Sequence, residues 1–247
     1  MQSALTLSAP PALATLEQGR AVALFVDFDG TLVELAKEPD SIAPAAGLAD
    51  HLMTLAHRLQ GRIAVVSGRT IDDIERHIGP LSIAVAGSHG SDIRSAFGKS
   101  LGNVARSLPA QIDAALRTYA NENDVIYEHK AHGGALHFRS NPEAGESASA
   151  FAKKVASDHG WKAQSGKCVI EIVSGDGNKG SAVRTFMNTP EFQHARPFFV
   201  GDDLTDEAGF AACQELGGAG ILVGERDETF AQYRLPDVSS VHTWLEI

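Results

Sequence analysis

The stretch from residue 21 to residue 31 constrains the fold more than any other part of the chain. Residues 21–26 carry no charge, which is typical of a parallel strand that is buried on both faces. Asp27 and Asp29 follow, and because side chains at i and i+2 point the same way from a strand, they should converge beyond its carboxyl end. Ligands bind at that edge of open α/β sheets. The alternative is an ordinary strand-to-turn junction, since Asp29 and Gly30 form a common turn pair.

Short apolar runs and amphipathic patterns alternate along the rest of the chain, which predicts a parallel, doubly wound sheet. The expected strands, besides the first, are 63–66, 83–86, 197–200 and 219–223. Leucines at i, i+4, i+7 and i+11 predict a helix over 48–59, and further helices are expected over 71–78, 205–216 and 238–245. Thr70 and Thr205 are the expected capping residues of two of these helices.

Residues 108–175 interrupt this alternation. A helix, a hairpin, a second helix and a second hairpin are expected here, with Gly133-Gly134 and Ser165-Gly166 as the two turns. This order predicts a small antiparallel sheet with helices on one face. We therefore expect an α+β domain at 108–175 that is inserted into a Rossmann-like core formed by 1–107 and 176–247.

Composition narrows the possible partners. The formal net charge is −10, which argues against nucleic acid, because binding a phosphate backbone requires a basic surface. No apolar stretch approaches the ~20 residues that span a bilayer, so no membrane partner is expected. Two cysteines are too few for a disulfide framework, and no secretory signal pattern is found at the amino terminus. We expect a cytoplasmic monomer that acts on a small molecule.

Three further polar clusters follow the expected strands or open a helix. Ser67 follows the strand at 63–66, where a hydroxyl can bind a phosphate oxygen, although Ser-Gly is usually only a turn. Asp202 and Asp206 follow the strand at 197–200, and oxygen ligands of this kind suit a hard cation, although acids also favour the first turn of a helix. Lys179 opens a helix, where it could neutralise a bound phosphate or remain an ordinary solvated lysine.

The order of these residues resembles that of a known superfamily. Asp27-x-Asp29-Gly30-Thr31, Ser67, Lys179 and Gly201-Asp202-Asp203-x-x-Asp206 are similar to the four motifs of the haloacid-dehalogenase (HAD) aspartyl phosphatases. The insert resembles the C2-type cap of that superfamily. The likeness implies a Rossmann-like HAD core with a cap domain that selects the substrate.

A narrower likeness is to the trehalose-6-phosphate phosphatases. It is carried by the segments Val-Val-Ser-Gly-Arg at 65–69, Ala-Gly-Ser-His-Gly at 86–90, Glu-His-Lys at 128–130, Leu-His-Phe-Arg at 136–139 and the strand at 166–172. One departure is Ser174, where that family more often has proline. The resemblance implies a hydrolase that releases phosphate from trehalose 6-phosphate.

The superfamily's chemistry implies a role for each motif residue. Asp27 would attack phosphorus and form an aspartyl-phosphate, while Asp29, protonated at that step, would serve as the acid and then the base. Mg²⁺ would be the cofactor, and the residues implied to hold it are Asp27, Asp29 through its backbone carbonyl, Asp202 and, through water, Asp206. The residues implied to bind phosphate oxygens are Thr31, Ser67 and Lys179.

The likeness also implies sugar-binding residues, namely His89, Glu128, Lys130 and Glu171. Without it, the charged residues of the insert would be interpreted as a solvated sheet face. The closest alternative is a HAD phosphatase for another phosphosugar, of the sucrose 6-phosphate or mannosyl-3-phosphoglycerate type. A phospho-acceptor signalling module is a further alternative, but the insert and the second carboxylate at Asp29 argue against it.

Overall fold

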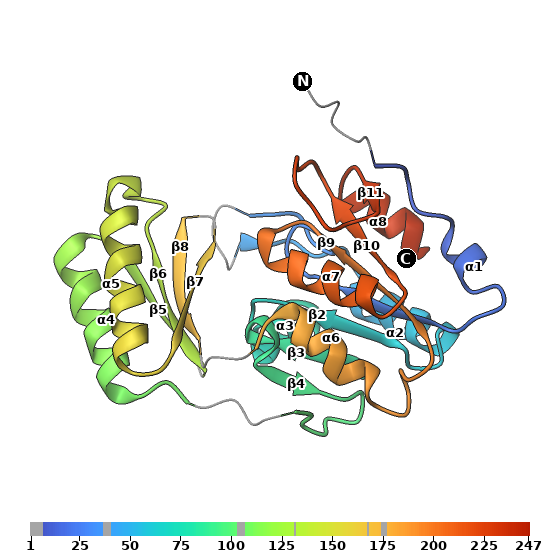
Figure 1. The fold of residues 1–247 in the computed structure, drawn as a ribbon, viewed down its shortest axis with the longest axis horizontal. Coiled ribbons are helices and arrows are strands. Elements are labelled where there is room, and N and C mark those ends of the chain that lie inside the picture. The colour runs from blue at the N-terminus through green and yellow to red at the C-terminus, as the bar shows by residue number, and fades with distance from the viewer. Residues whose placement is uncertain (1–6, 37–40, 103–106, 131, 167, 174–176) are drawn as a thin grey trace. The chain divides into compact units, whose positions relative to one another are not determined.

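The computed structural model describes residues 7–36, 41–102, 107–130, 132–166, 168–173 and 177–247. The chain divides into two compact units. The first, called here the core unit, comprises Met1–Gly102 and Asn178–Ile247, and the second, the inserted unit, comprises Asn103–Gly177. Each unit has its own sheet (Figure 1), so each is described by itself.

The core unit is built on a seven-stranded sheet. Its strands are, in spatial order, β11 (Tyr233–Leu235), β10 (Ala219–Val223), β9 (Arg196–Gly201), β1 (Val22–Val26), β2 (Ile63–Val66), β3 (Ala84–Gly87) and β4 (Asp92–Arg94). Neighbouring strands pair in parallel except for β3 and β4. This sheet confirms the predicted α/β fold class; the edge strands β4 and β11 were not predicted.

Helices cover both faces of the core sheet (Figure 1). One face packs against α1 (Leu13–Leu16), α2 (Leu48–Arg58), α3 (Ile71–Ile78) and α8 (Val238–Leu245), and the other against α6 (Lys179–Met187) and α7 (Glu207–Glu215). Alternate residues of β1 supply the two packed layers: Leu24 faces the first group of helices and Phe25 the second. Burial on both faces explains why the strands have nearly continuous apolar sequences.

Strand β1 lies at the point where the winding of the sheet reverses. From β1 the chain proceeds through β2 and β3 on one side, and later through β9 and β10 on the other. Val26 is in register with Val200 of β9 and Val65 of β2. The residues that follow these three strands therefore come out side by side at the carboxyl edge, where such sheets bind ligands.

The inserted unit has a four-stranded antiparallel sheet in the order β5-β6-β8-β7. Its elements are α4 (Ala110–Asn123), β5 (Ile126–Lys130), β6 (Gly133–His137), η3 (Pro142–Ala144), α5 (Gly145–Asp158), β7 (Lys162–Gly166) and β8 (Val169–Val173). Leu116 of α4 and Ala152 of α5 pack with Leu136 and Ile170 in one apolar cluster. Two helices therefore lie against one face of the sheet, while residues in the alternate register make up its other face.

Both predicted hairpin turns are misplaced. Gly133 and Gly134 lie within β6, and Ser165 and Gly166 lie within β7. The two glycines of β6 are explained by packing, because a Cβ on Gly133 would lie 2.5 Å from the Ile172 carbonyl oxygen. Position 167 and positions 174–176, which contain Ser174 and the expected end of the insert, lie outside the described residues.

The two predicted helix caps have different outcomes. Thr70 caps α3 as expected, because its hydroxyl accepts a hydrogen bond from the Asp73 N–H. Thr205 does not cap a helix: it lies inside a 3₁₀ turn, η4 (Leu204–Asp206), which precedes α7. That turn begins at Asp203, whose side chain and that of Asp206 form a reciprocal capping box. Asp203 is thus the N-cap residue of the 3₁₀ turn, and α7 follows from Asp206 without a side-chain capping bond among the described residues.

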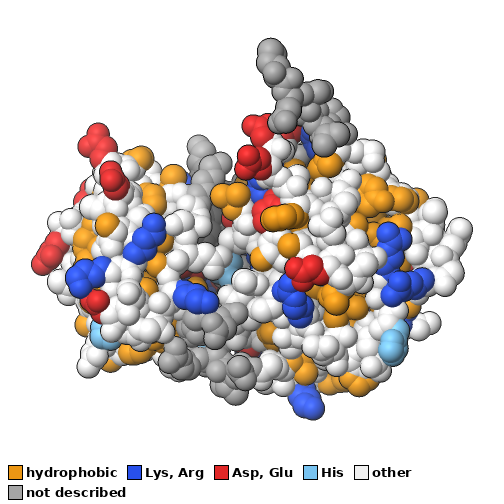
Figure 2. All heavy atoms as spheres, viewed as in Figure 1, with side chains coloured by type: hydrophobic (Ala, Val, Ile, Leu, Met, Phe, Trp, Pro, Cys, Tyr) orange, Lys and Arg blue, Asp and Glu red, His pale blue; other side chains and the backbone are white. Residues whose placement is uncertain are grey.

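Charged side chains of both signs are interspersed on the face drawn in Figure 2. On the face drawn in Figure 2, lysines and arginines lie singly or in small groups between acidic and uncharged side chains. None of the helices formed by the described residues is long and apolar enough to cross a membrane. The monomeric state and the cytoplasmic location stay predictions.

Candidate active site of the core unit

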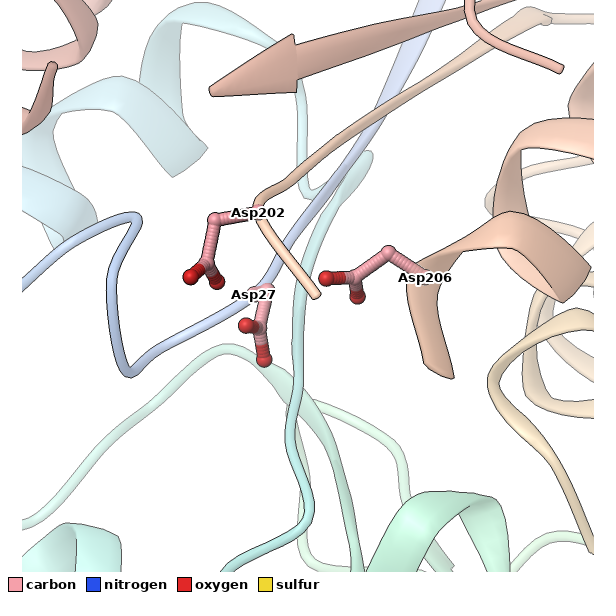
Figure 3. Close-up of side chains that lie close together, drawn as sticks. All are labelled: Asp27, Asp202 and Asp206. Carbon is pink, nitrogen blue, oxygen red and sulfur yellow. The ribbon is translucent and has the colours of Figure 1, made fainter. Parts of the chain in front are cut away.

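Three carboxylates converge at the carboxyl edge of the core sheet (Figure 3). Asp27 follows β1, Asp202 follows β9, and Asp206 closes the 3₁₀ turn before α7. One carboxylate oxygen from each lies within 4.8 Å of the others. Asp27 is held by its backbone, since its N–H donates to the Val200 carbonyl at 2.9 Å. The structure therefore brings together three of the four predicted metal ligands through their side chains.

Lys179 is buried against this cluster. It is the first residue of α6, where Asn178 caps the helix by accepting the Ser181 N–H. The Lys179 Nζ lies 2.7 Å from Asp27 Oδ1 and 2.6 Å from Asp206 Oδ1, and the lysine side chain is only 3% exposed. The prediction that Lys179 lies near the acids thus agrees with its position, and the ordinary solvated lysine is excluded.

The charges in this cluster do not balance. Burial and the nearby Asp206 raise the pKa of Asp27 well above its usual value, even though Lys179 acts in the opposite direction. Burial and Asp206 likewise raise the pKa of Asp202 to about 7. Burial alone would lower the pKa of Lys179, but Asp206 and Asp27 outweigh it and raise that pKa. One ammonium group thus faces three carboxylates, and the excess negative charge is what a divalent cation would neutralise.

The donor set fits a hard divalent metal. Asp202 Oδ1 is buried and has no hydrogen-bond partner among the described residues, and a bound ion is one of the groups that satisfy a buried oxygen of this kind. Its carboxylate packs directly on Gly30, where a Cβ would lie 2.2 Å from Asp202 Oδ2 and where φ is +75°. Carboxylate oxygens are the ligands that Mg²⁺ and Mn²⁺ prefer. The cluster can therefore hold such an ion, and Gly30 is needed to make room for the Asp202 carboxylate.

Asp206 differs from the other two acids because both of its oxygens are already engaged. Oδ1 accepts from Lys179 Nζ at 2.6 Å, and Oδ2 accepts from the Asp203 N–H at 2.8 Å. Its side chain is fully buried. Its oxygens are therefore less available to a metal ion than those of Asp202.

The carboxylate of Asp29 lies outside the acidic cluster formed by the described residues. Arg69 binds it in a bidentate pair, with Nε 2.7 Å from Oδ2 and Nη2 2.8 Å from Oδ1. Arg69 also bonds to Asp73 at 2.6 Å, and this pairing was not foreseen. The only signal for it in the sequence is that Arg69 follows Ser67-Gly68 at the end of a strand.

The predicted phosphate-binding hydroxyls lie at two neighbouring strand ends. Thr31 Oγ1 is buried and without a hydrogen-bond partner in the described part of the chain, and Ser67 Oγ accepts the Arg69 N–H at 3.1 Å. His89 adopts a left-handed backbone conformation (φ 56°). Its ring lies against Gly68, the residue after Ser67, where a Cβ would come within 2.5 Å of the ring. The structure thus places His89 next to Ser67.

The other predicted substrate residues gather on the face of the inserted sheet opposite its helices. The Lys130 Nζ lies 2.6 Å from Glu171 Oε1 and 3.9 Å from Glu128 Oε2. His137 joins them by bonding to Glu128 at 2.8 Å. Although burial opposes it, pairing with His137 and Lys130 lowers the pKa of Glu128. His137 was not predicted, although the two-residue alternation along β6 could have placed it on this face.

Comparisons with known proteins decide the family. The trehalose-phosphatase family model matches residues 25–239. The chain belongs to the trehalose-phosphatase family. A trehalose-6-phosphate phosphatase of Escherichia coli K12 is 33% identical over 243 residues, which cover 96% of this chain and 90% of that protein. Proteins of this family are phosphoric monoester hydrolases, so the chain is an enzyme of that class, as predicted.

Solved structures support the same fold. The C-terminal domain of a C. albicans trehalose-6-phosphate phosphatase matches with a TM-score of 0.82 at 20% identity, over 99% of this chain and 100% of that one. A Bacteroides thetaiotaomicron phosphatase of the haloalkanoate (HAD) superfamily matches with a TM-score of 0.63 at 16% identity, over 92% and 94%. The trehalose-phosphatase chain therefore has the HAD fold. HAD phosphatases use a divalent metal, for which the acidic cluster is the site that fits.

Proposed function

We propose that this enzyme hydrolyses trehalose 6-phosphate to trehalose and phosphate, with Mg²⁺ as its cofactor and with an aspartyl-phosphate intermediate on Asp27. Membership of the trehalose-phosphatase family supports the substrate. The observation that carries the chemistry is the buried cluster of Asp27, Asp202 and Asp206 around Lys179 at the carboxyl edge of the sheet.

Asp27 is proposed as the nucleophile because its position is fixed and because Lys179 lies against its carboxylate, where it offsets part of the burial that disfavours the charged form. Its backbone is hydrogen-bonded to β9 and its Oδ1 to Lys179. An in-line attack by a carboxylate oxygen forms the bond to phosphorus and breaks the bond to the sugar oxygen. Water then attacks the same phosphorus, and Asp27 leaves as a carboxylate.

The residues proposed to hold Mg²⁺ are Asp27, Asp202 and the backbone carbonyl of Asp29, with Asp206 acting through water. When bound, the ion neutralises the charge of the nucleophile and of the phosphate oxygens. Lys179 contributes a second positive charge to the same region, and its two ion pairs keep Asp27 and Asp206 in place.

Asp29 is proposed to carry the protons of both steps. It donates a proton to the leaving sugar oxygen and later accepts one from the attacking water. Both of its oxygens accept N–H groups from Arg69, so donation of a proton requires that one of these contacts opens when the substrate binds. Proton transfer by a positioned carboxyl group contributes roughly 10²–10⁴-fold to such reactions.

The phosphate oxygens are proposed to bind Thr31, Ser67 and Lys179. Thr31 supports this assignment most directly, since a buried hydroxyl without a partner among the described residues is costly unless a ligand binds it. Ser67 follows β2, the strand next to β1, and its hydroxyl can still donate while it accepts the N–H of Arg69.

The sugar is proposed to bind to the inserted unit, with residues 108–175 acting as the cap domain. Glu128, Lys130 and Glu171 form a polar surface of alternating charge, and such groups can each bind more than one sugar hydroxyl. His89, which lies beside Ser67 in the core unit, is proposed as a further contact.

A panel of phosphosugars tests this function. Trehalose 6-phosphate, glucose 6-phosphate, sucrose 6-phosphate and a mannosyl-3-phosphoglycerate are each assayed with Mg²⁺ and with EDTA. We expect kcat/KM to be highest for trehalose 6-phosphate, by about tenfold or more, and EDTA to abolish turnover of all four. Equal rates for glucose 6-phosphate would contradict the proposed substrate, and full activity in EDTA would contradict the metal.

A further inference from the structure

One arginine, Arg226, binds the loop after β9 that carries Asp202 and Asp203, called here the acidic loop. Arg226 lies in the loop after β10, and its guanidinium reaches back to the loop after β9. Its Nη2 donates to the Asp202 carbonyl at 2.6 Å, and its Nη1 donates to the Asp203 carbonyl at 3.1 Å. Nη1 also contacts Glu207 Oε1 at 2.7 Å. These contacts join segments that are 24 residues apart in the sequence.

Glu207 makes a second contact with the loop that carries Arg226. Glu207 opens α7, and its other oxygen, Oε2, accepts the Phe230 N–H at 2.7 Å. Arg226 and Glu207 are mostly buried, with side-chain exposures of 19% and 16%. A planar guanidinium can bind two successive carbonyl groups at once, whereas an ammonium group is a single point charge. Four hydrogen bonds therefore join the loop from 224 to 230 to Asp202, Asp203 and Glu207.

The position of Asp202 depends on the contacts of Arg226 more than the positions of Asp27 and Asp206 do. Lys179 binds the carboxylates of the other two acids, whereas Asp202 Oδ1 has no hydrogen-bond partner among the described residues. Its side chain is located by contact with Gly30 and by its own backbone. The backbone carbonyl of Asp202 is the group that Arg226 binds.

We propose that Arg226 is a positioning residue that holds Asp202 in the geometry needed for the metal ion. This inference rests on the proposed metal site. Arg226 binds two backbone carbonyls and Glu207 rather than the carboxylates of the acidic cluster, and its positive charge is balanced by Glu207 at 2.7 Å. It therefore acts through geometry and contributes little to the electric field at the site.

Charge and geometry predict opposite results when the arginine is removed. Arg226→Gln leaves Glu207 without its partner, so the site becomes more negative and would bind a dication more tightly if charge alone mattered. Loss of the two carbonyl contacts lets Asp202 move, which weakens binding. Groups that orient metal ligands typically change metal affinity by about 10–100-fold when they are removed.

The experiment titrates the full-length protein with Mg²⁺ and measures thermal stability in addition to hydrolysis. For Arg226→Gln and Arg226→Lys, we expect the half-saturating Mg²⁺ concentration for stabilisation to rise about tenfold, and kcat to recover when Mg²⁺ saturates. Arg184→Gln is the matched control, because Arg184 forms an exposed ion pair with Glu215 in the same unit. Arg226→Lys carries the test if Arg226→Gln does not fold.

Two results would overturn the inference. An unchanged half-saturating concentration would make Arg226 a stabilising contact only, and a lower one would mean that its charge outweighs its positioning. Wild-type protein that Mg²⁺ does not stabilise at all would overturn the metal site and the role of Arg226 together. The wild-type titration thus separates failure of the proposed function from failure of this inference.

Discussion

The two units use charged side chains in opposite ways. In the core unit the charged groups of the candidate site lie in the turns after strands or, for Lys179, at the start of a helix, and they are buried: Lys179 is 3% exposed and Asp206 is fully buried. In the inserted unit they lie along the strands and are more exposed, with Lys130 at 11% and Glu128 at 43%. Buried groups keep fixed positions and shifted pKa values, which suits bond making. Groups on a solvated face can exchange water for sugar hydroxyls, which suits recognition.

The largest expected effect comes from the proposed nucleophile. Asp27→Asn keeps the shape of the side chain but removes the attacking carboxylate, so kcat should fall by on the order of 10⁴-fold or more. Circular dichroism should show an unchanged fold. Asp50→Asn, on the exposed side of α2, is the control and should keep full activity. Substantial turnover by Asp27→Asn would remove Asp27 from the proposed role.

Removal of the buried ammonium should have the next largest effect. Lys179→Met leaves Asp27 and Asp206 buried without their partner. Breaking a buried pair in this way typically costs about 3–5 kcal/mol of the free energy of unfolding, which urea denaturation in EDTA can measure. Mg²⁺ should restore part of the loss. Lys154→Met removes an exposed pair with Asp158 and should change the free energy of unfolding by less than about 1 kcal/mol. Equal losses of the free energy of unfolding in the two variants would contradict the contrast between the units.

Protons should compete with the metal at Asp202. The pKa of this carboxyl is raised to about 7 in the folded protein, compared with about 3.9 in an unfolded chain. Between about pH 4 and 7 the folded protein thus holds a proton that the unfolded chain has lost, so the stability of the metal-free protein falls as pH rises through this window. Apparent Mg²⁺ affinity should therefore increase as pH rises through this window, by roughly tenfold per pH unit for each ligand carboxyl that must lose its proton. Thermal-shift titrations at several pH values measure this, and a constant affinity would contradict it.

The smallest effect is expected on the exposed face of the inserted sheet. His137→Gln loses the contact with Glu128 and should raise the KM for trehalose 6-phosphate by about two- to fivefold. His129→Gln is matched to it, because His129 pairs with Asp113 of α4 and so lies on the helix side of the same sheet. His129→Gln should leave KM unchanged. Equal changes in KM in the two variants would mean that the sheet face opposite the helices has no special role in substrate binding.

The sequence predicted the parts of the site that depend on strand ends. Residues that follow adjacent parallel strands must come out together, so Asp27, Ser67 and Asp202 could be placed from hydrophobic patterns alone. The pairing of Arg69 with Asp29 and the contacts of Arg226 could not, because they join loops whose paths depend on the packed structure. No local pattern predicts which partners these two arginines bind.

The inserted unit was predicted less accurately, for a related reason. Two glycines in succession are a common turn signal, but at Gly133 and Gly134 the absence of side chains serves close packing against the Ile172 carbonyl and Leu116. Tertiary contacts therefore decided the position of the hairpin. Which residues of a strand share a face could still be predicted, because side chains alternate between the two faces along each strand.

The central claim, that the core unit performs the chemistry and the inserted unit recognises the sugar, is tested most directly by a ratio of rates. The ratio compares kcat/KM for trehalose 6-phosphate with kcat/KM for p-nitrophenyl phosphate, in Lys130→Met and in the control Lys154→Met. We predict that Lys130→Met lowers the ratio by about tenfold or more, because it loses a charged hydrogen-bonding group that only the sugar uses, and that Lys154→Met leaves it unchanged. A Lys130→Met variant that loses activity equally toward both substrates would contradict the claim.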